Sequence, residues 1–347
     1  MKDFCLSSYM AFRYIWKDGM DFYPGFHHHN YEPTPNNERI PVKTSQDIDR
    51  EIQKQIDELY KKYDNIGILL SGGMDSANIA SYLKSGSHAY TFVSDTGVFD
   101  ADLERARTYC KKFGLQHHLI NITFEDYKRY TPIVMAAKGA PVHSIEPQIY
   151  KAAIAAKKDG VEMILVGESA DLIFGGMDKL IIPKWDYEGW VKRYTFLDPK
   201  LVLKDSVPQD ELFEKYRIGE KGVDVLKFMD EVFSIESSSS YLNAFGIAGL
   251  PYYDPYALLI MADPLDMTRV RGGEPKYLVR GLYNIKYPEF EIPFKIAMPR
   301  PVDAIFKDWN GPTRPEFRKD IPITELTGNQ KWQLWCAELF LNMFDFD

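Results

Sequence analysis

The sequence predicts an α/β protein built on a doubly wound parallel sheet, followed by a mostly helical C-terminal part. Short apolar runs alternate with helix-like segments between residues 66 and 168. The strand-like runs are IGILL (66–70), HAYTFVS (88–94), HHLINIT (117–123) and EMILVG (162–167). Such alternation is typical of parallel sheets with helices on both faces, whose ligands lie at the carboxyl ends of the strands.

The segments between these runs have helical features. NIASYL follows the first run, and QIYKAAIAAKK (148–158) consists of strong helix formers. Between the second and third runs, apolar residues recur at helical spacing and end at Gly114, which is suited to close a helix. These residues are Leu103, Ala106, Cys110 and Phe113.

The C-terminal part is expected to be mainly helical. One face of its last segment carries Trp332, Trp335, Cys336, Leu339, Phe340, Met343 and Phe344, with Lys331, Gln333 and Glu338 elsewhere. This pattern indicates a helix that packs an apolar stripe on the core. Residues 186–222 are rich in charge and proline, and we assign no element to them.

Composition narrows the class of protein. The chain has 347 residues, 45% of them hydrophobic, with a net charge of −8, so it is globular and poorly suited to bind a phosphate backbone. Its three cysteines are far apart and form no CxxC pair, which favours a reducing compartment. No stretch approaches the roughly 18 to 20 apolar residues of a membrane span. We therefore expect a cytoplasmic protein without membrane insertion or nucleic-acid partners.

The first apolar run leads directly into a glycine-rich turn, LLSGGMDS. Its Ser71, Gly72, Gly73 and Ser76 can direct backbone N–H groups and hydroxyls at one anion, as in a phosphate-binding loop. A carboxylate at the same place, Asp75, would repel phosphates unless a divalent cation such as Mg²⁺ lay between them. The alternative is a tight turn in which Asp75 only caps the following helix.

A second polar motif, ILVGESADLIFGGM, follows the last apolar run. Glu168 and Asp171 can face the same cleft as Asp75, since both motifs lie at the carboxyl ends of strands in the expected parallel sheet. Asp171 could then share a magnesium ion with Asp75, and Glu168 could accept a proton from a nucleophilic amine. The alternative is a capping box with solvated acids.

Taken together, these motifs resemble the synthetase domain of the asparagine synthetase family. SGGMDS is similar to the pyrophosphate loop of N-type ATP pyrophosphatases, and GESADLIFGG to the family's GEGADELFGGY. GLPYYDPYALLIMADPLDM resembles its RVPFLD segment, EPKYLVRGLY its EKYLLR segment, and KWQLWCAELFLNMF its last helix. The resemblance covers nearly the whole chain. It implies an adenine nucleotide alpha hydrolase-like, Rossmann-like domain over residues 61–347, with a linker-like segment (1–60) packed on it.

The resemblance also implies roles for individual residues. Pyrophosphate would be held by Ser71, Gly72, Gly73, Asp75 and Ser76, and the adenosine of ATP would be lined by Leu69, Val93 and Gly167. Asp75 and Asp171 would reach Mg²⁺. Glu168 would act beside the attacking amine, and Lys295, six residues before Pro301, would stabilise negative charge on the reacting groups.

The sequence departs from the family pattern in two places. A glutaminase domain needs a cysteine at the mature N-terminus, whereas here Lys2 follows Met1 and Cys5 is internal, so we expect the chain to lack that domain. A separate glutaminase partner could then supply ammonia.

The other departure concerns the acceptor. Ile247 and Gly249 stand where the family has a glutamate and an arginine, which argues against aspartate as the substrate. Four residues could instead meet an acceptor carboxylate, or could be ordinary helix-surface residues: Glu146, Gln148, Lys276 and Arg280.

We therefore expect an ATP-dependent, AMP-forming amide ligase. It would adenylate a small-molecule carboxylic acid and transfer it to ammonia or another amine. The breadth of the family leaves room for a non-amino-acid acceptor such as a sugar uronate. The alternatives are ammonia-dependent asparagine synthesis proper, another reaction of the same loop such as nucleobase thiolation, and a non-catalytic nucleotide-binding partner subunit.

Overall fold

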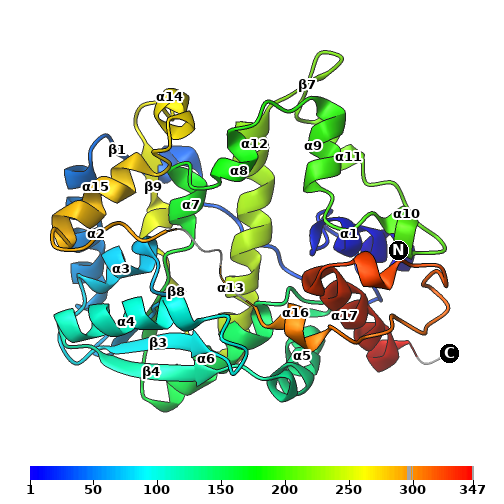
Figure 1. Ribbon diagram of the computed structural model, residues 1–347, viewed down its shortest axis with the longest axis horizontal. Helices are drawn as coiled ribbons and strands as arrows, with labels where there is room; N and C mark the ends of the chain where they lie inside the picture. Colours follow the sequence, from blue (N-terminus) through cyan, green and yellow to red (C-terminus); the bar gives the residue numbers. More distant parts are fainter. Residues whose placement is uncertain (295–297, 299, 346–347) are drawn as a thin grey trace.

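A computed structural model describes residues 1–294, 298 and 300–345. Its centre is a five-stranded, wholly parallel sheet in the order β4-β3-β2-β5-β8 (Figure 1). The strands are β2 (Ile66–Leu69), β3 (His88–Val93), β4 (Gln116–Asn121), β5 (Met163–Leu165) and β8 (Tyr252–Tyr253). Strand order reverses between β2 and β5, so the predicted doubly wound α/β fold is confirmed, with its switch point between these strands.

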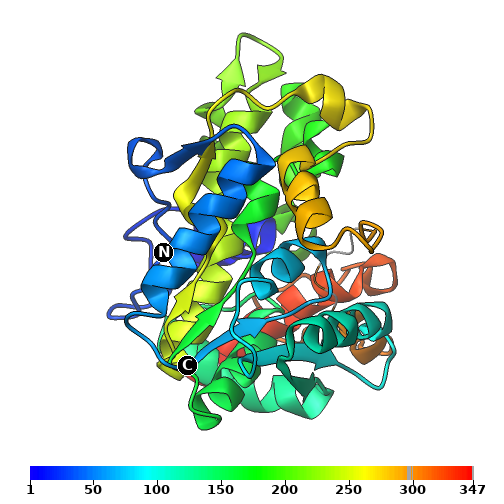
Figure 2. The ribbon, with the colours of Figure 1, turned by 90° about the vertical axis from the view of Figure 1, so that its left-hand side faces the viewer.

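Helices cover both faces of the sheet because its strands are apolar on both sides. In β2, Ile66 and Ile68 pack into one buried cluster and Leu69 into the other. The first face is covered by α2 (Ser45–Leu59), α3 (Met74–Ala80), α4 (Asp100–Phe113) and α15 (Tyr277–Lys286). Helices α2 and α15 lie on the side that faces the viewer in Figure 2.

The opposite face carries five helices of eleven or more residues. These are α5 (Phe124–Lys138), α6 (Glu146–Lys158), α13 (Ser234–Ala248), α17 (Gly328–Phe344) and the N-terminal α1 (Lys2–Phe12). Helices α1 and α17 are in contact, and Lys2 pairs with Asp345 at 3.0 Å. The division of the chain at residue 60 stays a prediction.

Smaller elements complete the structure. A parallel pair joins β1 (Ile40–Val42) to β9 (Leu259–Met261), and a hairpin joins β6 (Arg217–Ile218) to β7 (Gly222–Val223). The short helices are α7 (Ser169–Ile173), α8 (Asp178–Ile181), α9 (Tyr187–Tyr194), α10 (Pro199–Val202), α11 (Glu211–Glu214), α12 (Val225–Phe228), α14 (Met267–Arg271) and α16 (Val302–Ile305). A π-helical turn, Met229–Phe233, connects α12 to α13. Within the described residues, none of the helices combines the length and apolarity needed to cross a bilayer.

Two details differ from the expectations. Residues 186–222 contain helices where none was assigned, and each of α9 and α10 begins at an aspartate, Asp186 or Asp198, whose side chain accepts a backbone N–H bond. In the last helix, α17, two polar residues outside the apolar stripe are also buried. Gln333 is buried because its amide donates to the Tyr9 carbonyl at 2.8 Å, and buried Lys331 donates to the Phe306 carbonyl.

Candidate active site

The glycine-rich turn lies between the carboxyl end of β2 and the start of α3. Gly72 has a φ of +76°, a backbone conformation that favours glycine. A Cβ at this position would overlap the main chain of Asp102, with its carbonyl carbon only 2.9 Å away. Arg105 fixes the turn from outside by donating from Nε to the Gly72 carbonyl at 2.9 Å. The turn is therefore shaped by its backbone, as a phosphate-binding loop requires.

Hydroxyl groups line the inside of the turn. Ser76 Oγ accepts from the Ser71 backbone N–H at 3.2 Å and lies 3.1 Å from Ser71 Oγ. The Gly73 N–H donates to Ser71 Oγ at 3.3 Å. These long hydrogen bonds within the turn are weak. A bound anion could therefore replace them as the acceptor of the same N–H and hydroxyl groups with little loss of free energy.

The loop after β5 meets this turn directly. A Cβ on Gly167 would lie 3.2 Å from both the Asp75 carbonyl carbon and the Ser76 nitrogen. Glycine at this position lets the two strand ends approach each other. Leu69 and Val93 are the last residues of β2 and β3, at the same edge of the sheet. The structure thus brings these predicted residues together, while their contacts with ATP stay predictions.

Asp75 and Asp171 converge on one ammonium group. Lys276 Nζ lies 2.6 Å from Asp75 Oδ2 and 2.8 Å from Asp171 Oδ1, and only 5% of Lys276 is exposed. Burial alone would lower the pKa of Lys276, but the two carboxylates outweigh it and raise that pKa above its ordinary value. Asp75 is therefore not a simple helix cap, and we call this arrangement the Asp75–Lys276–Asp171 bridge.

Local backbone features hold the bridge in place. Lys276 has a φ of +54°, an unusual conformation for a residue with a side chain, and directly precedes α15. A Cβ on Gly176 would overlap Asp171 and approach Lys276 Cδ to 2.7 Å. Gly176, the second glycine of the GESADLIFGG motif, therefore leaves the space that the lysine side chain fills.

Lys276 is buried against two acids, so the alternative that it is an ordinary helix-surface residue is wrong. Binding of an acceptor carboxylate by Lys276 stays a prediction. Glu146 and Gln148 are also buried, so the surface alternative is wrong for them as well. Glu146 pairs with Lys138 at 3.0 Å, and Gln148 accepts from the Tyr127 hydroxyl at 3.1 Å. Lys295 lies outside the described residues.

Glu168 lies beside the bridge and is held by α13. Ser237 donates to its Oε1, and Tyr241 donates to its Oε2 at 3.0 Å. Burial raises the pKa of Glu168, and these two hydrogen bonds oppose that rise only in part. A carboxylate with a raised pKa is a better proton acceptor, which suits a general base.

A second acid, Asp254, fixes the start of α7. It accepts from the Ser169 N–H at 2.7 Å and from the Tyr256 N–H at 3.0 Å. With Glu168 it lines a cavity of only about 10 Å³, enough for about one water molecule. Burial raises the pKa of Asp254 to about 7.

This shift predicts a pH dependence of stability. Because the folded-state pKa lies above the ordinary 3.8, ionisation of Asp254 disfavours the folded state. The protonated Asp254 side chain makes its full contribution to folding stability below pH 3.8. As pH rises from 3.8 to about 7, the free energy of unfolding should fall by at most about 4 kcal/mol. The measurement is urea unfolding of wild type and Asp254→Asn across this range. The Asp254→Asn variant loses one hydrogen-bond acceptor, which should lower its stability by the same amount at every pH. Its stability relative to wild type should therefore rise with pH. A stability difference that does not change with pH would contradict the prediction.

The positions where the family carries a glutamate and an arginine have structural roles here. Gly249 ends α13 in a left-handed conformation with a φ of +63°, and Ile247 packs against the core. Lys157 Nζ donates to the neighbouring Ala248 carbonyl at 3.1 Å.

A cavity of about 400 Å³ opens beside Asp171. Its walls are mainly aliphatic and come from α7, α8, α12 and β9, including Ile173, Ile260 and Leu265. Arg39 and Asp230 add one ion pair at 3.7 Å. A compartment of this size and lining suits a small molecule with an apolar body.

Comparisons with known proteins agree with these features. The family model for asparagine synthase matches residues 47–241. A putative glutamine-hydrolysing asparagine synthetase of Methanocaldococcus jannaschii is 28% identical over 142 residues, which cover 40% of this chain. The match spans about a quarter (26%) of that relative's length.

Two solved structures show only distant similarity. The NMN synthetase of Francisella tularensis has a TM-score of 0.29 and 12% identity, over 64% of this chain and 99% of that chain. The U34-tRNA thiolase NcsA of Methanococcus maripaludis has a TM-score of 0.28 and 13% identity, over 72% of this chain and 82% of that chain. TM-scores this low do not support any assignment of function. The family model, in contrast, matches more than half of the sequence. The chain belongs to the asparagine synthase family.

Proposed function

We propose that the protein is an ATP-dependent ligase that forms an amide from a carboxylic acid and ammonia or another amine, with AMP and pyrophosphate as products. The observation that carries this proposal is the Asp75–Lys276–Asp171 bridge beside the turn at Ser71–Gly73. A binding-only subunit would have no need for two acids and a buried cation next to Glu168.

The bridge supports a role for Mg²⁺. The carboxylates of Asp75 and Asp171 would repel the triphosphate of ATP unless cations stood between them and the phosphates. Carboxylate oxygens are the donors that Mg²⁺ prefers, and Asp75 and Asp171 already converge on one cation, so these residues fit the metal. Bound there, Mg²⁺ would neutralise charge on the phosphate oxygens.

In the first step, a carboxylate oxygen of the acid attacks the α-phosphorus of ATP. The bond from that phosphorus to the oxygen bridging the β-phosphate breaks, which gives an acyl-adenylate and pyrophosphate. The Gly72 and Gly73 N–H groups and the hydroxyls of Ser71 and Ser76 hold the pyrophosphate as its charge develops. Lys276 contributes a fixed positive charge at the same place, and we keep Lys295 as a second candidate cation.

In the second step, the amine nitrogen attacks the acyl carbon. The bond between that carbon and the AMP oxygen breaks, and Glu168 accepts the proton that the nitrogen loses. Its contacts with Ser237 and Tyr241 orient the carboxylate toward this task.

The acid itself is best identified with a panel. Sugar uronates belong in it, and so do acids with apolar bodies, because the cavity beside Asp171 is mainly aliphatic. Aspartate tests asparagine synthesis proper, and ammonia is compared with glutamine as nitrogen source. AMP and pyrophosphate should form only with the correct acid, and formation of ADP and phosphate instead would reject adenylation.

Glu168→Gln should separate the two steps. The variant keeps the size of the side chain but removes the proton acceptor, so we expect amide formation to fall about 10²–10⁴-fold. Acid-dependent exchange of pyrophosphate into ATP should continue near the wild-type rate. Equal loss of both activities would show that Glu168 serves the first step or the fold. In wild type, amide formation should also decline as pH falls through the raised pKa of Glu168, because only the ionised form accepts a proton.

A further inference from the structure

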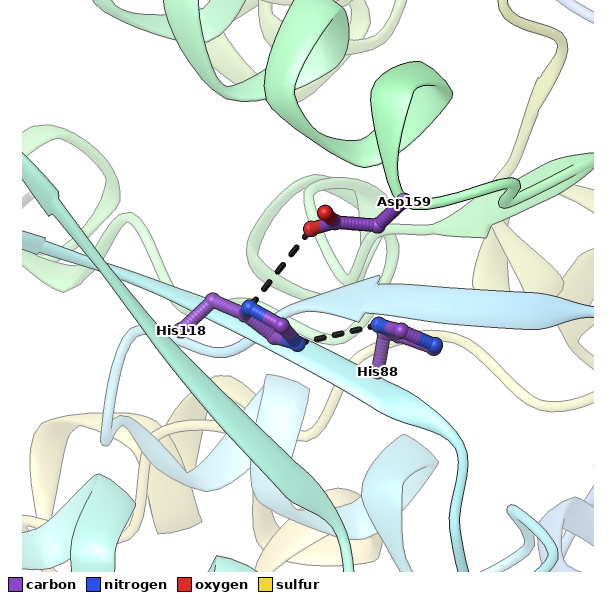
Figure 3. Close-up of side chains that lie close together, drawn as sticks. All are labelled: His88, His118 and Asp159. Atoms are coloured by element: carbon purple, nitrogen blue, oxygen red, sulfur yellow. Dashed lines mark hydrogen bonds and ion pairs between the residues drawn. The ribbon is translucent and has the colours of Figure 1, made fainter.

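A cluster of nitrogen and oxygen donors lies at the far end of the strands from the glycine-rich turn. His88 begins β3, His118 lies in β4, and Asp159 directly follows α6 (Figure 3). His88 Nδ1 is 2.9 Å from His118 Nε2, and His118 Nδ1 is 3.5 Å from Asp159 Oδ2. One donor atom from each residue lies within 4.8 Å of the other two.

Neighbouring groups orient these side chains. The Tyr90 hydroxyl donates to Asp159 Oδ2 at 2.9 Å, and the Tyr90 ring stacks on His118 with centroids 4.8 Å apart. His118 in turn stacks on His88 at 4.9 Å. Tyr90 is buried, so it holds a carboxylate and an imidazole in fixed positions, as the outer partners of metal ligands do.

The two imidazoles and the carboxylate indicate which kind of ion would bind. Two imidazole nitrogens that face each other need a proton or a cation between them, because two lone pairs repel. Tetrahedral zinc, with bonds of about 2.0–2.1 Å, sets its ligands about 3.3 Å apart. His88 Nδ1 and His118 Nε2 need to separate by only a few tenths of an ångström. Asp159 contacts the other nitrogen of His118, Nδ1, so its carboxylate must turn toward the metal from a position where one donor atom of each residue lies within 4.8 Å of the others.

We propose that His88, His118 and Asp159 form a binding site for a divalent transition metal of the zinc class. Two imidazoles and one carboxylate suit Zn²⁺, Co²⁺ or Ni²⁺ rather than Mg²⁺, which prefers oxygen donors throughout. Solvent can supply the remaining ligand, because Asp159 is exposed. Among the described residues this is the one group of three such side chains close enough to hold an ion.

The site is independent of the proposed chemistry. From His88 to Val93, β3 covers about 16 Å at about 3.3 Å per residue, so the metal lies far from the carboxyl edge of the sheet. Its ligands come from β3, β4 and the end of α6, and a bound ion would join these three elements. Metal binding should therefore stabilise the folded chain without taking part in ATP turnover.

The test uses the full chain, stripped of metal and kept in excess Mg²⁺ so that oxygen-donor sites are occupied. Titration with Co²⁺ should give one equivalent of visible absorption from nitrogen coordination, and Zn²⁺ should displace it and raise the thermal unfolding midpoint. His88→Ala and His118→Ala should lose the band and bind Zn²⁺ at least tenfold more weakly. Asp159→Asn, at an exposed position where folding is not at risk, should weaken binding about tenfold.

Two variants serve as matched controls. His117 lies next to His118, but its ring contacts Thr91 Oγ1 at 2.8 Å, so His117→Ala should keep the full band. His27→Ala removes an exposed histidine from the HHH run (27–29) and should also keep it. Absence of a band in the wild type, or equal bands in all variants, would overturn the proposal and leave a simple hydrogen-bonded chain.

Discussion

Lys276→Ala is expected to lower acid-dependent pyrophosphate formation by about 10²–10³-fold. The substitution removes a buried cation that contacts both Asp75 and Asp171 at less than 3 Å. Asp75 and Asp171 then lose the cation that they share, and breaking a buried pair in this way costs about 3–5 kcal/mol of folding stability. Mg²⁺ should restore part of that stability, because a divalent cation can take the place of the ammonium between the carboxylates.

The matched control for this variant is Lys286→Ala. Lys286 is in the same helix, α15, and pairs with Asp49 at 2.6 Å, but its side chain is more exposed and lies outside the site. Its loss should cost about 1 kcal/mol or less and leave the rate unchanged. Urea unfolding with and without Mg²⁺, together with pyrophosphate release, measures both effects. A Lys276→Ala protein with the wild-type rate would remove the bridge from the mechanism.

Gly72→Ala should abolish measurable ATP turnover, with a loss of more than about 100-fold. The new Cβ meets the main chain of Asp102, and alanine also disfavours the left-handed conformation of this residue. The turn must therefore move, which displaces the donors of Ser71 and Gly73 from any phosphate. The measurement is exchange of labelled pyrophosphate into ATP.

Two other glycines separate backbone strain from steric overlap. Gly86 also has a positive φ, +89°, but a Cβ there meets nothing within 4 Å, so Gly86→Ala carries only the strain of about 1–2 kcal/mol. Gly73 has an ordinary φ of −78° and only Ser71 Oγ nearby, at 3.3 Å. Both variants should retain the fold, and Gly86→Ala should retain full activity. If Gly86→Ala is as inactive as Gly72→Ala, overlap with Asp102 is not the cause.

The sheet could be predicted because short stretches of the sequence are enough to indicate its strands and helices. The run Ile66–Leu69 is apolar on both faces of a buried strand, and Gly114 ends α4 in the expected left-handed conformation. The convergence of the loops after β2 and β5 followed from topology, since parallel strands end at one edge. In the same way, recognisable motifs were enough to identify the family.

The rest of the candidate site depends on contacts between distant residues. Lys276 reaches Asp75 across 201 positions, and only its place in the family-like EPKYLVRGLY segment distinguishes it from a surface lysine. Ser237 belongs to a run of four serines that resembles a low-complexity tract, yet it binds Glu168. The short helices α9 and α10 were missed because one or two turns give too little periodicity, although the sequence shows the aspartates that cap them.

The pairing of α1 with α17 has a consequence for synthesis of the chain. Residues Cys5 to Phe12 are buried without interruption, and the Tyr9 carbonyl accepts a hydrogen bond from Gln333, 324 positions away. Helix α1 therefore lacks this partner until the ribosome has made α17. The apolar surface of α1 must stay exposed, or be shielded by a chaperone, while the intervening chain is synthesised, so this layer of the protein closes only after α17 has emerged.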